Sequence, residues 1–507
     1  MKRLSLILSL IFLVSLSASG YAGVNLGMTG AVKERAEKLD EKAKVVKEPT
    51  EEEKEEAKKK VEEANGSLEE AMDSLGESQE YGDENYEKAM DDLEEANSFF
   101  KEALEKDPNN PEANLGAAIT EIILIGEDPE IKEAMEKLWA WLESFGENFM
   151  GSPIFMPKRL QAPPKDKAVS ALAAIIENEP LTMSELQDIT KDKVLPKIDY
   201  ITKRLEVVEN SSWESTTFEF TLDSEAIKDF ISSNFNDSEE FNSIEEMIDE
   251  IFGTFANAGN GETFSVEIDK TDVYLYDGVL QLLKSVLSGF CAWNLDIVYD
   301  DFEDPEKIKT AIMIMKIVEK QSPYDKFLTL KDSGMLEAAG NALDASAAKW
   351  LTAIESLENE TDDQQNDLLP KPEDLDEDGE KMKYALNQLR EALRGTTTID
   401  FTYYDPESTL PELKINLNAF YFTNQMQDLR DYFIPAVEAW PWDPPYSEEP
   451  KFEDIDDDGL TPDWNDPTFN GVFPGMTNEK LKEYFEALAF FEDEESFFED
   501  EEMAPRR

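Results

Sequence analysis

Two helical patterns joined by a proline-flanked turn place the strongest restriction on how this chain can fold. They occupy residues 83–128, and the turn between them spans residues 107–111. In the first pattern, Ala96 and Ala103 are small enough to let a neighbouring helix come close, and Phe100 fills the gap between them. A proline in the turn stops the first helix because proline lacks a backbone N–H and clashes with the preceding turn. The segment therefore predicts a closely packed helical hairpin.

The same spacing resembles the second half of a tetratricopeptide (TPR) repeat. In that family a small residue, an aromatic residue, a second small residue and a helix-ending proline recur in order, here Ala96, Phe100, Ala103 and Pro108. The likeness covers about one repeat, and no other stretch of the chain repeats it at the family's period. The resemblance implies stacked helical hairpins that present a concave surface to a protein partner.

Helical patterns prevail in the rest of the chain, and period-two alternation marks four short strands. Apolar and polar side chains alternate at residues 218–222, 264–268, 399–403 and 413–417. These strands could form one small antiparallel sheet with helices on a single face. The predicted fold is mainly α with a small antiparallel β-sheet, in which TPR-like helical hairpins are followed by an α+β portion.

Two further helical patterns bear on packing. Residues 57–75 carry an alanine-rich heptad seam that favours a helix packed on its own domain over a coiled coil with a partner, with a possible break at Gly66. Residues 271–297 form the most apolar pattern of the chain, yet Asp277 and Lys284 lie together on one side of it. That polar strip argues against a membrane span and favours a central core helix.

Composition divides the chain into six successive segments. Residues 1–22 are typical of a cleaved secretory signal, with two basic residues, an apolar run and small residues up to Ala22. No cysteine follows the apolar run, so we expect an exported protein, periplasmic or secreted, without a lipid anchor or a transmembrane span after cleavage. The other segments are charged helices (23–80), a TPR-like helical region (81–209), an α+β domain (210–434), a Pro- and Asp-rich segment with a last helix (435–491) and an acidic disordered tail (492–507).

Charge and missing residue types exclude several functions. The 114 acidic residues outnumber the 48 basic ones and give a net charge of −66, which repels nucleic acid. Because the chain has no histidine, His-dependent catalysis and most zinc sites are excluded. The single cysteine, Cys291, lies in an apolar stretch that is typical of a buried structural thiol. Paired carboxylates could still hydrolyse glycosides, a reaction that needs no histidine.

One Asp-rich stretch predicts a metal site. Asp454, Asp456 and Asp458 occupy positions 1, 3 and 5 of a loop whose sixth residue is glycine. The pattern resembles the calcium loops of EF-hand, dockerin and thrombospondin type 3 repeats, in which Ca²⁺ takes several oxygens from a flexible loop. The resemblance implies a Ca²⁺ ion bound by these three carboxylates, completed by a main-chain carbonyl near Leu460 and by Asp463.

The later positions of this loop depart from the families' patterns. Asp463 comes one residue late for the thrombospondin form, and Asn465 stands where an EF-hand has its bidentate Glu. A solvated acidic loop without metal is therefore the alternative. A second run at residues 374–379 shares the spacing but passes into a helical pattern, so there we favour a helix whose N-terminus is capped by Asp376 or Asp378.

These patterns favour a non-catalytic exported protein of the bacterial cell envelope that binds protein partners through its helical-hairpin surface and acts as a scaffold. Two alternatives remain, a carboxylate-based glycoside hydrolase and a purely structural envelope component.

Overall fold

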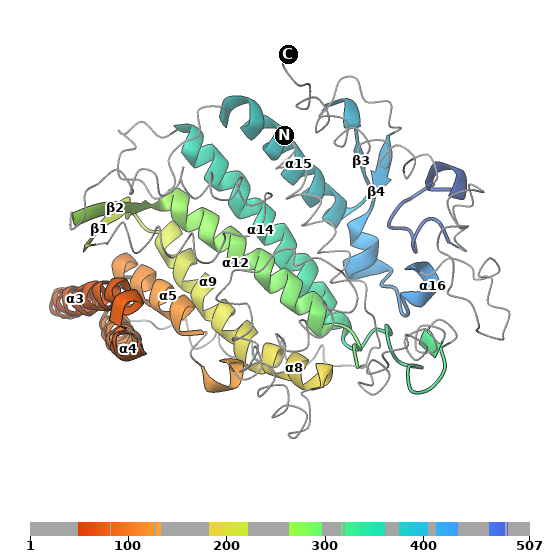
Figure 1. Cartoon of the computed structure of the whole chain (residues 1–507). Coiled ribbons are helices and arrows are strands. Elements are labelled where there is room, and N and C mark those ends of the chain that lie inside the picture. Colours follow the sequence, from red (N-terminus) through yellow and green to blue (C-terminus); the bar gives the residue numbers. More distant parts are fainter. Residues whose placement is uncertain are drawn as a thin grey trace, which may run out of the picture. The chain divides into compact units, whose positions relative to one another are not determined.

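The fold is mostly helical (Figure 1). The computed structural model describes residues 49–81, 83–125, 128–132, 182–221, 263–296, 316–317, 320–359, 375–403, 412–433, 466–481 and 484. Besides helices, these residues form two short antiparallel sheets of two strands each, so the predicted mainly α fold with a small antiparallel β content is confirmed. Among the described helices, none combines the length and the apolar character needed to cross a membrane.

The chain divides into two compact units, and each contains segments that are distant in sequence. The boundary between them falls after Lys284 in one long helix, α12 (Lys270–Cys291), and after Ala347 in another, α14 (Ser333–Asn359). The predicted division into six successive segments stays a prediction, and residues 1–22 and 492–507 lie outside the described part of the chain.

The described elements of the larger unit run from α3 to the first part of α12 and include the end of α14. In order they are α3 (Glu51–Tyr81), α4 (Asp83–Lys106), α5 (Pro111–Ile125), α8 (Met183–Ile189), the π-helical turn η1 (Thr190–Val194), α9 (Leu195–Glu209), β1 (Ser215–Thr221) and β2 (Thr263–Asp269).

Helices α3 and α4 pack along faces rich in small residues. Buried side chains of α3 meet buried side chains of α4, and Ile268 of β2 packs against the same cluster. The main members are Ala57, Val61, Ala64, Leu68 and Ala71 on α3 and Leu93, Ala96, Phe100 and Ala103 on α4. The seam of α3 is thus used inside its own unit, as favoured from the sequence. The helix also runs through Gly66 without a break, because the packing of the flanking residues offsets the roughly 1 kcal/mol that a glycine costs a helix.

The turn between α4 and α5 lies where the sequence predicts it. α4 ends at Lys106 and α5 begins at Pro111. The Asn110 side chain caps α5 by accepting a hydrogen bond from the Ala113 N–H at 2.9 Å. The hairpin and the burial of Phe100 between the two helices agree with the spacing argument, whereas membership of the TPR family stays a prediction.

A wide helical turn precedes Pro196. α8, η1 and α9 form one uninterrupted helical run, in which η1 has π-helical hydrogen bonding immediately before the proline. Proline has no N–H and its ring clashes with the carbonyl four residues earlier, and the wider turn relieves that clash. Thr182 and Glu185 form a capping box at the start of the run.

β1 and β2 pair in antiparallel register from Ser215 opposite Asp269 to Thr221 opposite Thr263. β2 passes directly into α12, and its last residue caps that helix. The Asp269 carboxylate accepts from the Asp272 N–H at 3.0 Å, while the Asp272 carboxylate accepts from the Asp269 N–H at 3.1 Å. This junction fixes the direction in which α12 leaves the sheet.

The smaller unit contains the end of α12, the start of α14 and the elements after it. These are α15 (Leu375–Arg394), β3 (Thr397–Ile399), the 3-10 turn η4 (Phe401–Tyr403), β4 (Leu413–Ile415), the π-helical turn η5 (Ala419–Thr423) and α16 (Arg430–Phe433). Its core includes Trp293, which is fully buried and stacks on Phe420 with ring centroids 6.1 Å apart.

The sequence suggested that the four strands could form one sheet, but they do not. Among the described residues, β1 pairs with β2 and β3 pairs with β4, in two separate sheets. The third strand is also shorter than its alternation suggested, because the backbone turns into η4 at Phe401. Tyr403 then stacks on Tyr384 of α15 with centroids 4.1 Å apart, so alternating aromatic residues serve helix packing here rather than a longer strand.

Candidate functional site

The residues predicted to bind Ca²⁺ lie outside the described residues. These are Asp454, Asp456, Asp458, Leu460 and Asp463. Within the described ranges, no group of three or more acidic or cysteine side chains is arranged to hold a metal ion. The calcium site therefore stays a prediction from the sequence.

The structure describes one border of each Asp-rich stretch: Asp466, after the first stretch, and the start of α15, within the second. Asp466 accepts hydrogen bonds from the Thr468 N–H at 3.0 Å and the Asn470 N–H at 2.8 Å, and so closes a tight turn. Burial opposes the ionisation of Asp466, but these bonds lower its pKa overall. In the second run, α15 begins at Leu375, which is earlier than the helical pattern predicted. Asp376 and Asp378 lie inside its first turn rather than at the capping position before it.

The most informative polar cluster joins α9, α12 and α14 in the larger unit. Lys349 of α14 forms ion pairs with Glu209, the last residue of α9, and with Asp277 of α12, whose carboxylate lies 2.9 Å from the ammonium. The two carboxylate side chains are only 6% and 2% exposed, and that of Lys349 is 22% exposed. Two buried carboxylates thus share one ammonium, which leaves the cluster one negative charge in excess.

Close helix packing brings these groups together. Beside Asp277, Gly278 lies against the indole of Trp350, the residue after Lys349. A Cβ atom on Gly278 would lie 2.2 Å from the Cδ1 atom of Trp350, so only glycine permits this approach. Further along, the Thr271 hydroxyl donates to the Ser356 hydroxyl at 2.9 Å and ties the same two helices together. The spacing of α12 and α14 is therefore set by contacts on both sides of the ion pair.

The surroundings of Glu209 disfavour its ionised form. Burial raises the pKa of Glu209 to about 7 against the opposing effect of the Lys349 ammonium, and the neighbouring Asp277 carboxylate adds to the rise. One of its carboxylate oxygens, Oε1, is buried without a hydrogen-bond partner. Burial alone would lower the pKa of Lys349, but its contacts with the two carboxylates raise it overall, so the lysine stays an ammonium. The cluster can bind or release one proton near neutral pH, whereas Lys349 cannot act as a nucleophile.

Helix α12 also exposes apolar residues on the side opposite this cluster. Tyr276, Val279 and Leu283 are 42%, 53% and 43% exposed, and their spacing of three and four residues puts them on one face. We call them the α12 stripe. They are three of the five large apolar side chains that are exposed in the described part of the chain. A core helix ordinarily turns its apolar side inward, yet here the side that carries Asp277 is buried.

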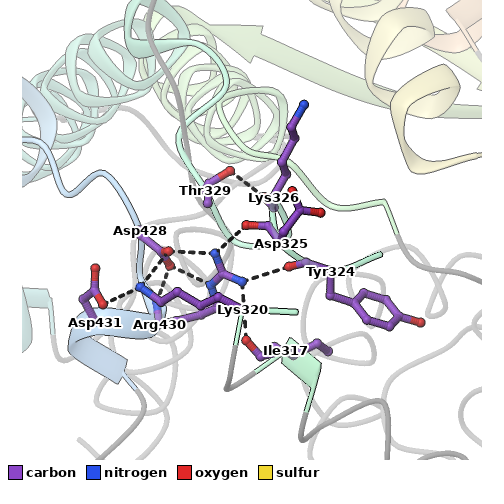
Figure 2. A network of polar contacts seen from close by, with 9 residues as sticks. All are labelled: Ile317, Lys320, Tyr324, Asp325, Lys326, Thr329, Asp428, Arg430 and Asp431. Atoms are coloured by element: carbon purple, nitrogen blue, oxygen red, sulfur yellow. Dashed lines mark hydrogen bonds and ion pairs between the residues drawn. The ribbon is translucent and has the colours of Figure 1, made fainter. Parts of the chain in front are cut away.

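A second buried charge cluster lies in the smaller unit (Figure 2). The Arg430 guanidinium binds both carboxylate oxygens of Asp428, at 2.8 and 2.7 Å, and donates to the main-chain carbonyls of Tyr324 at 2.8 Å and Asp325 at 3.0 Å. Lys320 pairs with the same Asp428 at 2.9 Å. Burial opposes the ionisation of Asp428, but the two cations lower its pKa overall. Each charge has an opposite charge or several carbonyls beside it, so this cluster joins loops rather than offering a binding site.

The sequence did carry a signal for the α9–α12–α14 cluster that pattern reading missed. Lys349 is the only basic residue within α14, and Asp277 lies inside the apolar helix α12. A basic and an acidic residue inside two apolar helices are candidates for a buried pair, since charges are seldom buried without a partner. Cys291 is buried, in agreement with a structural thiol.

Known proteins do not narrow the function further. No protein-family model matches the chain, and comparison with curated proteins and with solved structures found no match.

Proposed function

We propose that the protein is a non-catalytic, exported interaction scaffold of the bacterial cell envelope. The observation that supports this function best is the α12 stripe, in which Tyr276, Val279 and Leu283 leave a row of apolar surface on a chain of net charge −66. Apolar side chains scattered singly over a surface need no explanation, but a row along one helix face is typical of a protein-binding surface.

The chemistry of the stripe and of the whole chain suggests what the partner is like. An amphipathic helix binds such a row through apolar residues spaced three and four apart. Because the chain carries 114 acidic against 48 basic residues, a partner with basic residues flanking its apolar face is attracted and an acidic partner is repelled. We therefore expect a basic, amphipathic protein segment.

The hydrolase alternative has no support from the described carboxylate pair. Glycosidases need two carboxyl groups about 5–10 Å apart with the sugar between them. The Lys349 ammonium contacts both Glu209 and Asp277, and both carboxylates are buried, so the pair belongs to an internal ion-pair cluster rather than to an open cleft. A purely structural role differs from the scaffold in one respect, since it requires no partner on the stripe.

The test is crosslinking in the native cell envelope followed by mass spectrometry, with three forms of the full chain. In one variant Val279→Glu and Leu283→Glu replace two exposed stripe residues; in the control Thr352→Glu alters an exposed position on α14. Substitutions at exposed positions change stability by no more than about 0.5 kcal/mol, so the variants should stay folded.

We expect the wild type and the control to crosslink to the same protein and the double variant to lose at least about 10-fold of the yield. Equal capture by all three forms would exclude the stripe as the docking surface. Sugar release by the purified chain, together with no captured protein, would favour the hydrolase instead.

A further inference from the structure

We propose that the Glu209 carboxyl is a proton-binding site whose occupancy controls how firmly α9, α12 and α14 pack together. The proposal rests on the α9–α12–α14 cluster and is independent of any docking on the α12 stripe. The ligand is a proton from solvent, and binding forms one O–H bond on the Glu209 carboxylate.

Charge balance in the cluster is the first argument. Lys349 is the single cation between two carboxylates that are 94% buried or more. With Glu209 ionised, one negative charge is left over in a site from which water is largely excluded, and an uncompensated buried charge is costly. With a proton on Glu209, the remaining Asp277 carboxylate and Lys349 ammonium form a neutral pair.

The unsatisfied oxygen of Glu209 is the second, independent argument. Its Oε1 atom is buried and has no hydrogen-bond partner. A carboxylate oxygen without a donor favours the neutral acid, because only the charged form loses much by the missing bond. Glu209 is also the last residue of α9, where the partial negative charge of the helix end adds to the repulsion.

The groups that face Glu209 from the packed elements do not compensate for this charge. α12 contributes Asp277 and Tyr274, and the pKa of Tyr274 is raised by burial and then by the negative charge of Glu209. α14 contributes Lys349, which Asp277 shares. Lys270, at the start of α12, donates instead to the main-chain carbonyl of Ser211 at 2.8 Å.

α5 also packs against α9, but its acidic group is engaged elsewhere. Glu121 forms an ion pair with Lys101 at 2.9 Å and lies 3.9 Å from Lys197. Lys197 precedes Glu209 by twelve residues, which is about 18 Å along the helix. No second cation therefore reaches Glu209 from these elements within the described residues.

The direction of the pH effect follows from the pKa of Glu209, which lies at about 7 in the folded chain and at an ordinary 4.5 when unfolded. The folded state then holds the proton more tightly. The stabilisation is complete below pH 4.5 and is lost as the pH rises through 7. Since one pKa unit corresponds to a tenfold change, the unfolding equilibrium constant of the larger unit should rise roughly 10- to 100-fold between pH 5 and pH 8 on account of this group.

The experiment measures denaturant unfolding of the full chain from pH 5 to pH 8 in wild type, Glu209→Gln and Glu206→Gln. The glutamine at position 209 keeps the shape of the protonated acid and cannot titrate. Glu206 is exposed on the same helix, so its substitution removes the same charge without touching the cluster. We expect the 10- to 100-fold pH effect in wild type and Glu206→Gln, and its loss in Glu209→Gln.

A second measurement keeps the proposal testable if Glu209→Gln folds poorly. Carbon-13 NMR of glutamate carboxyls in the wild type should contain one resonance that titrates near pH 7. In Asp277→Asn this titration should move to lower pH, because a like charge has been removed beside Glu209. Equal pH dependence of wild type and Glu209→Gln, or a spectrum in which every glutamate titrates near 4.5, would overturn the proposal.

Discussion

At the scale of single residues, similar ion pairs in this protein differ in how deeply they are buried. Arg430 has its guanidinium on both oxygens of Asp428 and on two carbonyls, and its side chain is 1% exposed (Figure 2). Arg394 makes a comparable pair with Asp344 at 3.1 Å but is 59% exposed. The two arginines thus form similar ion pairs in very different surroundings.

Replacing each arginine by methionine should separate the two cases. Arg430→Met leaves the carbonyls of Tyr324 and Asp325 without this donor, and we expect a loss of about 3–5 kcal/mol in the free energy of unfolding of the smaller unit. Arg394→Met should cost less than about 1 kcal/mol, because water screens an exposed pair. Urea unfolding measures both. Similar losses in the two variants would contradict a special role for burial.

At the scale of elements, two glycines within helices differ in the space that surrounds them. Gly116 of α5 lies against the ring of Phe100, and a Cβ atom there would come within 2.1 Å of the Cζ atom. Phe100 is 1% exposed, so its ring has no free space into which to move. Gly66 of α3 has nothing within 4 Å of the position that a Cβ atom would take.

The same substitution at these glycines should therefore have opposite effects. Gly66→Ala should stabilise the larger unit by about 0.5–1 kcal/mol, since alanine restricts the unfolded chain and favours a helix. Gly116→Ala should destabilise it by about 1–3 kcal/mol through overpacking, in spite of the same helical preference. Chemical unfolding of wild type and the two variants measures these changes in the free energy of unfolding. Stabilisation by Gly116→Ala would mean that α4 and α5 are less tightly packed than described.

The positions of the long helices could be predicted from the sequence, but their packing could not. Helical period and turn residues predicted α4, α5 and most of α15, because the signals for these elements are local. Which side of α12 is buried is not a local property. Asp277 is buried because Lys349, distant in sequence, neutralises it and because Gly278 lets Trp350 come close. A hydrophobic pattern alone cannot foresee a partner that comes from another helix, and for the same reason it could not assign β1 and β3 to separate sheets.

At the scale of the whole molecule, the net charge of −66 makes stability depend on salt. Like charges repel in the compact state, and ions screen that repulsion over about 10 Å at 0.1 M. Any divalent cation should therefore raise the melting temperature, whether or not it has a binding site. A test of the calcium site predicted at Asp454, Asp456 and Asp458 must separate site binding from this general screening.

Thermal unfolding can distinguish binding at the site from general screening. The melting temperature is measured in millimolar Ca²⁺, in Mg²⁺ and in chelator for wild type, Asp458→Ala and Glu105→Ala. Glu105 is an exposed acid of α4, so its loss changes the net charge equally without touching the predicted loop. At ten times a dissociation constant of about 10⁻⁴–10⁻³ M, a bound ion stabilises by about 1.4 kcal/mol. We expect wild type and Glu105→Ala to gain more from Ca²⁺ than from Mg²⁺ and Asp458→Ala to gain equally from both, because only screening remains once a first ligand is removed. If all three proteins respond alike to the two ions, the Asp-rich loop is a solvated acidic segment and the calcium prediction is wrong.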